Sequence, residues 1–127
     1  MRETVYKKFG GCCAYCGDDI HIKQMEVDHI IPKSNYDMFV MNNYKIPTFL
    51  KHLTIDDVEH IDNKFPSCIK CNRFKDNYDL ESFRRELFKQ LERARKYSTN
   101  YQRALKWKQV KETPTPIIFY FEQLKTL

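Results

Sequence analysis

The chain has 127 residues, a length typical of one domain with a small hydrophobic core. Its 22 Lys and Arg residues outnumber 17 Asp and Glu residues, which gives a net charge of +5. Five Cys are too few for a disulfide scaffold, and no apolar run is long enough to span a bilayer. No apolar segment opens the chain, so we expect a cytoplasmic protein with reduced thiols and no membrane partner.

The first elements predicted along the chain are a short helix over residues 2–9 and a strand over residues 20–27. Val5 and Phe9 share one helical face, and apolar residues alternate with polar ones from residue 20. Residues 36–62 are predicted to form an irregular or partly helical insertion.

A short helix is predicted inside that insertion, over residues 55–61. Thr54 and Asp57 form an N-cap pattern, and the apolar residues that follow lie at helical spacing. The acidic side chains of Asp56, Asp57 and Glu59 are interpreted as charges at the start of this helix.

Two basic helices are predicted in the C-terminal part of the chain. Asp79 is expected to cap a long helix with one apolar stripe, and a second helix is expected within residues 101–110. The apolar segment 117–121 is expected to pack back on the protein as a strand or tail. Residues 83–111 contain ten Lys or Arg and two Glu, a pattern that fits either a nucleic-acid contact or an ordinary solvated helix face.

Four of the five Cys form two C-x-x-C pairs, Cys13 with Cys16 and Cys68 with Cys71. This spacing allows two thiolates of one turn to bind the same ion, and a closed structural zinc site needs four ligands. A redox role is the alternative, but neither pair lies in a βαβ context. We therefore predict one structural zinc ion that joins the two pairs.

Asp28 and His29 lie between the two Cys pairs, at the end of an apolar segment. A carboxylate is a hard oxygen ligand suited to Mg²⁺, and a His side chain can take a proton near neutral pH. An adjacent Asp and His are by themselves common and usually structural.

The order of these motifs is more specific than any of them alone. The chain reads C-A-Y-C-G, then V-D-H-I-I-P, then N-K-F-P-S-C-I-K-C-N-R-F-K. This arrangement resembles the HNH endonuclease family, in its four-Cys zinc-knuckle variety. The resemblance covers roughly residues 2–90. It implies an α+β fold with a small ββα-metal (His-Me finger) nuclease core, clamped by the zinc site and flanked by helices.

The resemblance also implies a role for each matching residue. His29 matches the general base that activates water, and Asp28 matches the metal-binding acid before it. Asn63 matches the Asn that braces the loop and orients the base, with Asn42 or Asn43 as competitors that lack the following Pro and Cys context. Asn72 matches the second metal ligand.

The activity implied is hydrolysis of DNA phosphodiester bonds with one Mg²⁺ or Mn²⁺ ion held by Asp28 and Asn72, which leaves 5′-phosphate and 3′-hydroxyl ends. Basic residues near the motif or on the long helix are expected to contact phosphates: Lys33, Arg73, Lys75, Arg84 and Arg85.

Two other functions remain open. A zinc-stabilised nucleic-acid-binding module without catalysis would use the basic C-terminal part, and a protein-interaction domain would use the apolar segment 117–121. We expect a nuclease domain over residues 1–97 and a basic extension over residues 98–127 that packs on it. Sequence specificity is expected to be weak or supplied by a protein partner, and the sequence leaves the oligomeric state open.

Overall fold

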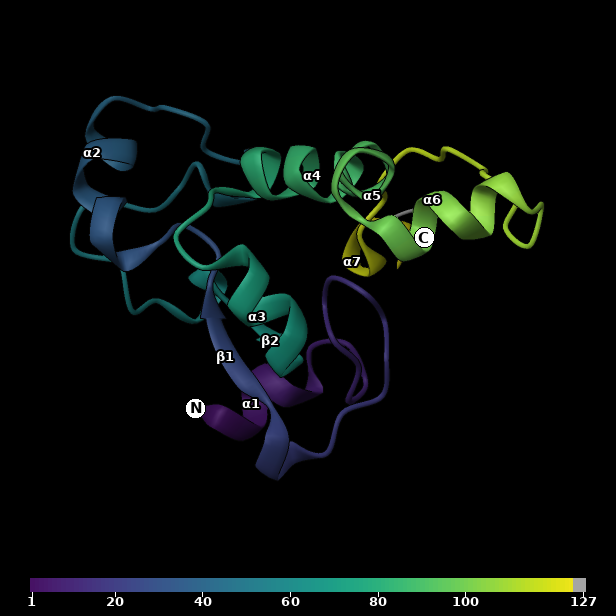
Figure 1. Ribbon diagram of the computed structural model, residues 1–127. Coiled ribbons are helices and arrows are strands. Elements are labelled where there is room, and N and C mark those ends of the chain that lie inside the picture. Colours follow the sequence, from purple (N-terminus) through teal and green to yellow (C-terminus); the bar gives the residue numbers. More distant parts are fainter. Residues whose placement is uncertain (125–127) are drawn as a thin grey trace. The chain divides into compact units, whose positions relative to one another are not determined.

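The computed structural model describes residues 1–124 and combines helices with one small sheet (Figure 1). Strands β1 (Glu26–His29) and β2 (Lys64–Ser67) pair in antiparallel fashion. The register places His29 opposite Lys64, at the end of the sheet. The predicted α+β class is confirmed at this level. Among the described residues, no helix is long and apolar enough to cross a membrane.

The chain divides into two compact units. The first contains Met1–Phe83 together with residues 118–124, and the second contains Arg84–Ile117. The predicted division between residues 97 and 98 stays a prediction.

The first unit contains the sheet and several short helical elements. A buried Val5 anchors the N-terminal helix, which forms as predicted. The α-helices of this unit are α1 (Arg2–Lys7), α2 (Tyr36–Met41), α3 (Ile69–Lys75) and α7 (Tyr120–Gln123). The 3₁₀ turns are η1 (Ile22–Gln24), η2 (Lys33–Asn35), η3 (Thr48–Leu50) and η4 (Ile61–Asn63).

The strand predicted over residues 20–27 was wrong in its bounds. The ring of His21 accepts a hydrogen bond from the backbone N–H of Lys23, and this local bond stabilises the turn η1 in place of an extended chain. Regular strand structure starts at Glu26. The apolar alternation at residues 20–22 was therefore too short a signal to outweigh a local side-chain bond.

The helix predicted over residues 55–61 was also wrong. The Asp57 carboxylate accepts bonds from the backbone N–H and the hydroxyl of Thr54, as the capping pattern suggested. The backbone bonds that follow, from Asp57 to Thr54 and from His60 to Asp57, each span three residues and not four. The segment is therefore a series of turns, and Glu59 is not a helix-start charge.

An aromatic cluster forms the core of the first unit. Phe119 and Phe121 are buried in it, with Phe121 4.8 Å from Phe65 and Phe119 5.3 Å from Tyr15 between ring centroids. Rings at these separations combine burial with favourable edge and offset contacts. The C-terminal apolar segment therefore packs back as predicted, although its regular part is the short helix α7 and not a strand.

The same segment is bonded to the first Cys pair. The backbone N–H groups of Tyr120 and Phe121 donate to the carbonyl oxygens of Tyr15 and Ala14, at 3.0 and 2.9 Å. Gly17 has a φ of +81°, and a Cβ atom there would lie 2.8 Å from Cδ1 of Tyr120. Glycine is therefore required both by the turn and by the close ring.

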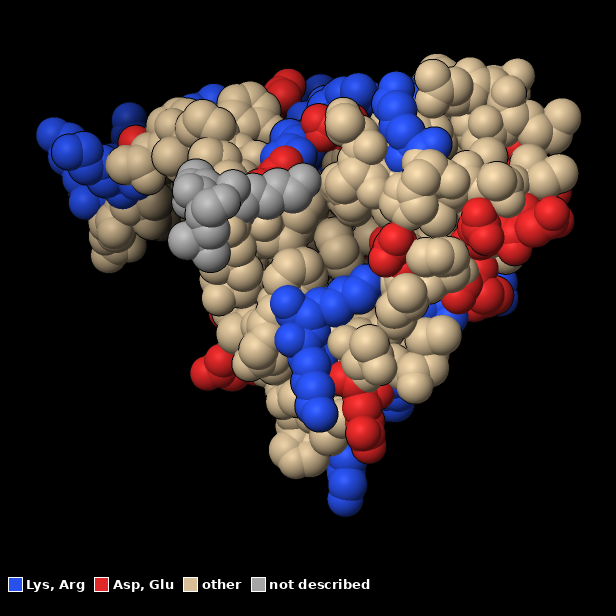
Figure 2. All heavy atoms as spheres, turned by 180° about the vertical axis from the view of Figure 1, so that it is seen from behind, with Lys and Arg blue, Asp and Glu red and all other residues tan. Residues whose placement is uncertain are grey.

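The second unit is helical and basic. Its helices are α4 (Leu80–Phe88), whose first residues belong to the first unit, α5 (Gln90–Tyr97) and α6 (Thr99–Lys106). Asp79 caps α4 as predicted, because its carboxylate accepts from the N–H of Ser82. The predicted long helix is broken at Lys89. Figure 2 shows Lys and Arg side chains gathered at the end of this unit that α6 forms, at the left of the view.

Candidate metal centre and active site

The four cysteines of the two C-x-x-C pairs form one cluster. The Sγ atoms of Cys13, Cys16, Cys68 and Cys71 all lie within 4.8 Å of one another, and those of Cys16 and Cys68 are 3.8 Å apart. A tetrahedral zinc ion with Zn–S bonds of about 2.3 Å holds its sulfur atoms roughly 3.8 Å apart. The cluster is therefore positioned to bind a metal ion of the zinc type.

Backbone bonds bring the two pairs together across the sequence. The N–H of Ala14 donates to the carbonyl of Pro66 at 2.9 Å, and so joins the first Cys turn to β2. The Sγ atom of Cys68 accepts from the N–H of Cys71 at the start of α3. One Cys pair thus lies directly beside the strand, and the other begins the helix that follows it.

Within the cluster, thiols strongly shift one another's pKa values when no cation is present. A hydrogen bond from Cys71 lowers the pKa of Cys13 to about 4, whereas burial and neighbouring sulfur atoms raise the pKa of Cys16 to about 12. The pKa of Cys71 is raised by its bond to Cys13. Four thiolates at this distance repel one another, and a divalent cation removes that penalty.

Asp28 is buried in β1, directly before the last residue of the strand, and contacts two residues that the sequence did not connect to it. Tyr15 donates its hydroxyl to one carboxylate oxygen, and the ammonium of Lys75 lies 3.2 and 3.3 Å from the two oxygens. Burial raises the pKa of Asp28, and the adjacent ammonium opposes that rise. Oδ2 therefore has two partners, whereas Oδ1 has one and keeps a further lone pair.

Lys75 was predicted to contact a phosphate, but the structure places it in the interior. Its side chain is 0% exposed, and its ammonium also donates to the carbonyl oxygens of His29 and Ile30 at 3.0 and 3.3 Å. Burial lowers the pKa of Lys75. This ammonium joins α3 to the end of β1 and has no surface to offer to DNA.

His29 ends β1 and is partly exposed, with 20% of its side chain accessible. Its Nε2 atom lies 3.0 Å from the carboxylate of Glu59, a residue that the sequence had assigned to a helix start. Lys33 and Lys64 contact the same carboxylate at 3.3 and 3.1 Å. These three partners lower the pKa of Glu59 to about 2, with the His29 bond as the largest cause.

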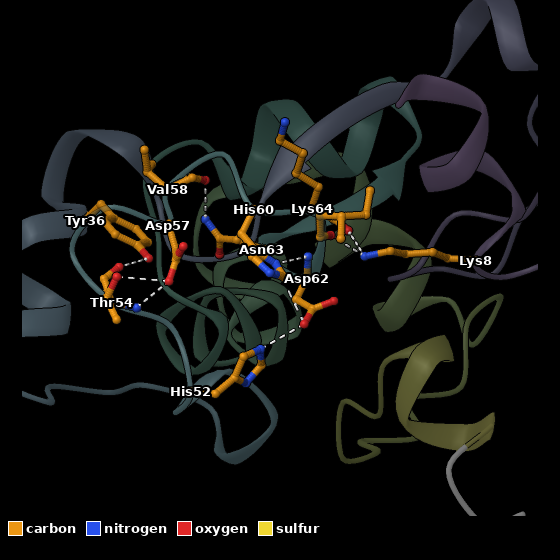
Figure 3. Close-up of polar contacts among 11 residues, drawn as sticks. Lys8, Tyr36, His52, Thr54, Asp57, Val58, His60, Asp62, Asn63 and Lys64 are labelled. Carbon is orange, nitrogen blue, oxygen red and sulfur yellow. Dashed lines mark hydrogen bonds and ion pairs between the residues drawn. The ribbon is translucent and has the colours of Figure 1, made fainter.

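Asn63 is completely buried at the end of η4. Its side-chain oxygen accepts from the N–H of Ile31 at 2.8 Å, and its amide nitrogen donates to the carbonyls of Ile31 and Val58 at 3.2 and 3.0 Å. Figure 3 shows the bond to Val58, and near it the bonds of Lys8 that fix the same turn. Asn63 therefore holds the loop after His29 against the segment that carries Glu59.

Asn72 lies on α3, three residues before Lys75 and thus on the same side of the helix. Its side chain is partly exposed, and its amide has no hydrogen-bond partner within residues 1–124. The helix packs against β1 through Lys75. The amide oxygen of Asn72, a candidate metal ligand, therefore lies on the element next to Asp28. Arg73, the next residue, is exposed.

The other basic residues predicted to contact phosphates differ in their exposure and in the partners that they already have. Lys33 is 63% exposed and contacts Glu59. Arg84 donates to the carbonyl of Ile117 at 2.7 Å inside the second unit, whereas Arg85 is exposed. Arg84 therefore has at least one structural partner that competes with a phosphate.

Comparison with protein families finds a match to part of the chain. The model of the HNH endonuclease family matches residues 13–43, which include the first Cys pair, Asp28 and His29. The predicted resemblance to this family is confirmed over these residues. Asn63, Asn72 and the second Cys pair lie beyond the matched residues. No curated protein and no solved structure matches the chain.

Proposed function

We propose that the protein is a metal-dependent HNH endonuclease that hydrolyses DNA phosphodiester bonds. The observation that carries the proposal is the convergence of His29, Asp28 and Asn63 at the end of a two-stranded sheet, beside a helix that starts from the Cys cluster. The match of the HNH family to residues 13–43 supports it independently. In this interpretation β1, β2 and α3 form a ββα-metal core, and the zinc ion is structural.

The oxygen atoms near His29 are ligands of the kind that a hard divalent metal ion prefers. Asp28 offers the carboxylate oxygen Oδ1, which keeps a lone pair, and Asn72 offers an amide oxygen, so these two residues would hold Mg²⁺ or Mn²⁺. When bound there, such an ion would stabilise the charge that develops on the phosphate and the leaving oxygen. Because Lys75 already neutralises Asp28, we expect weak metal binding in the free protein and tighter binding when DNA adds its phosphate.

His29 takes a proton from the attacking water in this mechanism. A neutral imidazole near pH 7 suits that role, which typically contributes about 10²–10⁴-fold to the rate. Asn63 keeps the loop after His29 in place through hydrogen bonds to the backbone N–H and carbonyl of Ile31. Exposed basic residues such as Arg73 and Lys33 are the candidates for contact with neighbouring phosphates.

Cleavage of a labelled DNA duplex tests the proposal. We expect cleavage with Mg²⁺ or Mn²⁺, none with EDTA, and products that a ligase can rejoin because they carry 5′-phosphate and 3′-hydroxyl ends. Intact DNA across a range of salt and pH, with protein that holds one zinc ion, would contradict the proposal.

A zinc-stabilised DNA-binding module without catalysis is the second candidate. The second unit supports it, because its exposed cations include Arg103, Lys106, Lys108 and Lys111. Such binding weakens steeply with salt. The module interpretation predicts salt-sensitive DNA binding that persists in His29→Ala, together with no cleavage by either protein.

A further inference from the structure

The Glu59 carboxylate is a feature of the site that the family motif does not include. Its Oε1 atom lies 3.0 Å from Nε2 of His29 and 3.1 Å from Nζ of Lys64, and its Oε2 atom lies 3.3 Å from Nζ of Lys33. A carboxylate that remains ionised can only accept hydrogen bonds. Nε2 of His29 must therefore be the donor in this contact.

This contact determines which nitrogen of His29 can act as a base. A neutral imidazole carries one proton, and a proton on Nε2 leaves the lone pair on Nδ1. Within the described residues, Nδ1 of His29 has no hydrogen-bond partner. The ring thus has one nitrogen that is held by a carboxylate and one that is available to take a proton.

The position of Glu59 is set by the framework around it. Lys64 lies directly opposite His29 in the sheet register, and its side chain is only 10% exposed. Asn63 donates to the carbonyl of Val58, the residue before Glu59. The Glu59 carboxylate therefore bridges His29 and Lys64, which are paired across the end of the sheet. The carbonyl of the preceding residue, Val58, is hydrogen-bonded to the buried Asn63 (Figure 3).

We propose that Glu59 is a positioning residue for His29, which orients the ring and holds the proton on Nε2 so that Nδ1 takes the proton of the attacking water. This inference rests on the proposed nuclease function. A positioned carboxylate behind a catalytic imidazole is a general way to fix both the tautomer and the direction of the ring. Glu59 lies 30 residues from His29 in the sequence, within the insertion.

The test compares Glu59→Gln and Glu59→Ala with the wild type in metal-dependent DNA cleavage. We expect kcat to fall by about 10–100-fold, a usual cost when an orienting group is removed. KM should stay unchanged or decrease, because the loss of a negative charge favours DNA binding. Glu59→Asp keeps a carboxylate and should recover part of kcat. Asp56→Asn is the matched control, since it removes one exposed charge from the same segment and should cleave like the wild type.

The outcomes separate this inference from the nuclease proposal. Cleavage by Glu59→Gln at the wild-type rate overturns the positioning role and leaves the nuclease function intact. Faster cleavage also overturns it, because the carboxylate would then obstruct a phosphate site. No cleavage by the wild type overturns the nuclease function and with it the catalytic meaning of Glu59. In that case ¹⁵N NMR of His29 still reports whether Nε2 is protonated in the wild type and whether Glu59→Ala changes the tautomer.

Discussion

The ammonium of Lys75 lies 3.2 Å from Oδ2 of Asp28, and both side chains are buried, with 0% and 5% of their surface exposed. Each charge is therefore the main compensation for the other in an interior where an isolated charge is costly. The two residues are separated by 47 positions in the sequence, and their contact joins helix α3 to strand β1.

Removal of the Lys75 charge is predicted to destabilise the fold. Lys75→Met keeps most of the side-chain volume but leaves the Asp28 carboxylate without its ammonium, which typically costs about 3–5 kcal/mol in the free energy of unfolding. Urea denaturation of the zinc-loaded protein measures this loss. Lys70→Met, at an exposed position of the same helix, should differ little from the wild type. In the double variant Asp28→Asn with Lys75→Met, much of the loss should be recovered, and equal stability of Lys75→Met and Lys70→Met would contradict the assignment.

Asn63→Asp is predicted to destabilise the protein although it preserves the shape of the side chain. The amide group that donates to the carbonyls of Ile31 and Val58 is replaced by an acceptor, which leaves both oxygens without these donors. A buried polar group without a partner costs about 1–3 kcal/mol. Thermal or urea unfolding measures the change. A neutral effect of Asn63→Asp would show that water or another donor replaces the amide.

One zinc ion per chain is predicted, and its loss should unfold the first unit. Cys71→Ser removes one of the four clustered ligands, so that metal content measured by mass spectrometry should fall and the melting temperature should drop. Cys12→Ser is the control, because Cys12 lies outside the cluster and contacts Asp19. If Cys71→Ser retained a full zinc ion and the wild-type melting temperature, the four-Cys site would be refuted.

Acid is predicted to remove a contribution that Glu112 makes to the second unit. The bonds from Arg95 and Tyr101 lower the pKa of Glu112 to about 2 from an ordinary value of 4.5. Since the folded state holds the proton less tightly than the unfolded state, the contribution is complete above pH 4.5 and is lost as the pH falls toward 2.

The unfolding free energies of the wild type and Glu112→Gln measure this effect. Their difference should be largest at neutral pH and should shrink between pH 4.5 and 2. Because both proteins carry the same Cys cluster, its own response to acid cancels in the comparison. A difference that stays constant through this range would mean that the ion pair with Arg95 does not form.

Features that depend on neighbouring residues could be predicted from the sequence. The C-x-x-C spacing indicated the two halves of a metal site, Asp79 indicated the start of α4, and the order of the motifs indicated the HNH resemblance. Each of these signals lies within a few residues or in a short ordered motif. These signals can therefore be interpreted without knowing which distant segments of the chain meet in the folded protein.

Features that depend on distant contacts could not be predicted in the same way. A Lys beside a C-x-x-C pair has the same local pattern whether it faces solvent or, like Lys75, a buried carboxylate 47 residues away. Glu59 follows two Asp residues and suggests a helix start, yet three-residue turns direct it toward His29. In both cases the decisive partner comes from another segment that the sheet brings close.

The most direct test of the proposed activity is plasmid cleavage by wild type and His29→Ala, side by side, with Mg²⁺, Mn²⁺ and EDTA. Both proteins should first be shown to be folded with one zinc ion each, and His21→Ala serves as the control at an exposed His outside the site. We predict that the wild type and His21→Ala nick or linearise the plasmid with a divalent ion, whereas His29→Ala leaves it intact. Equal cleavage by His29→Ala, or metal-independent cleavage by all three proteins, would contradict the assignment of His29 as the general base of an HNH endonuclease.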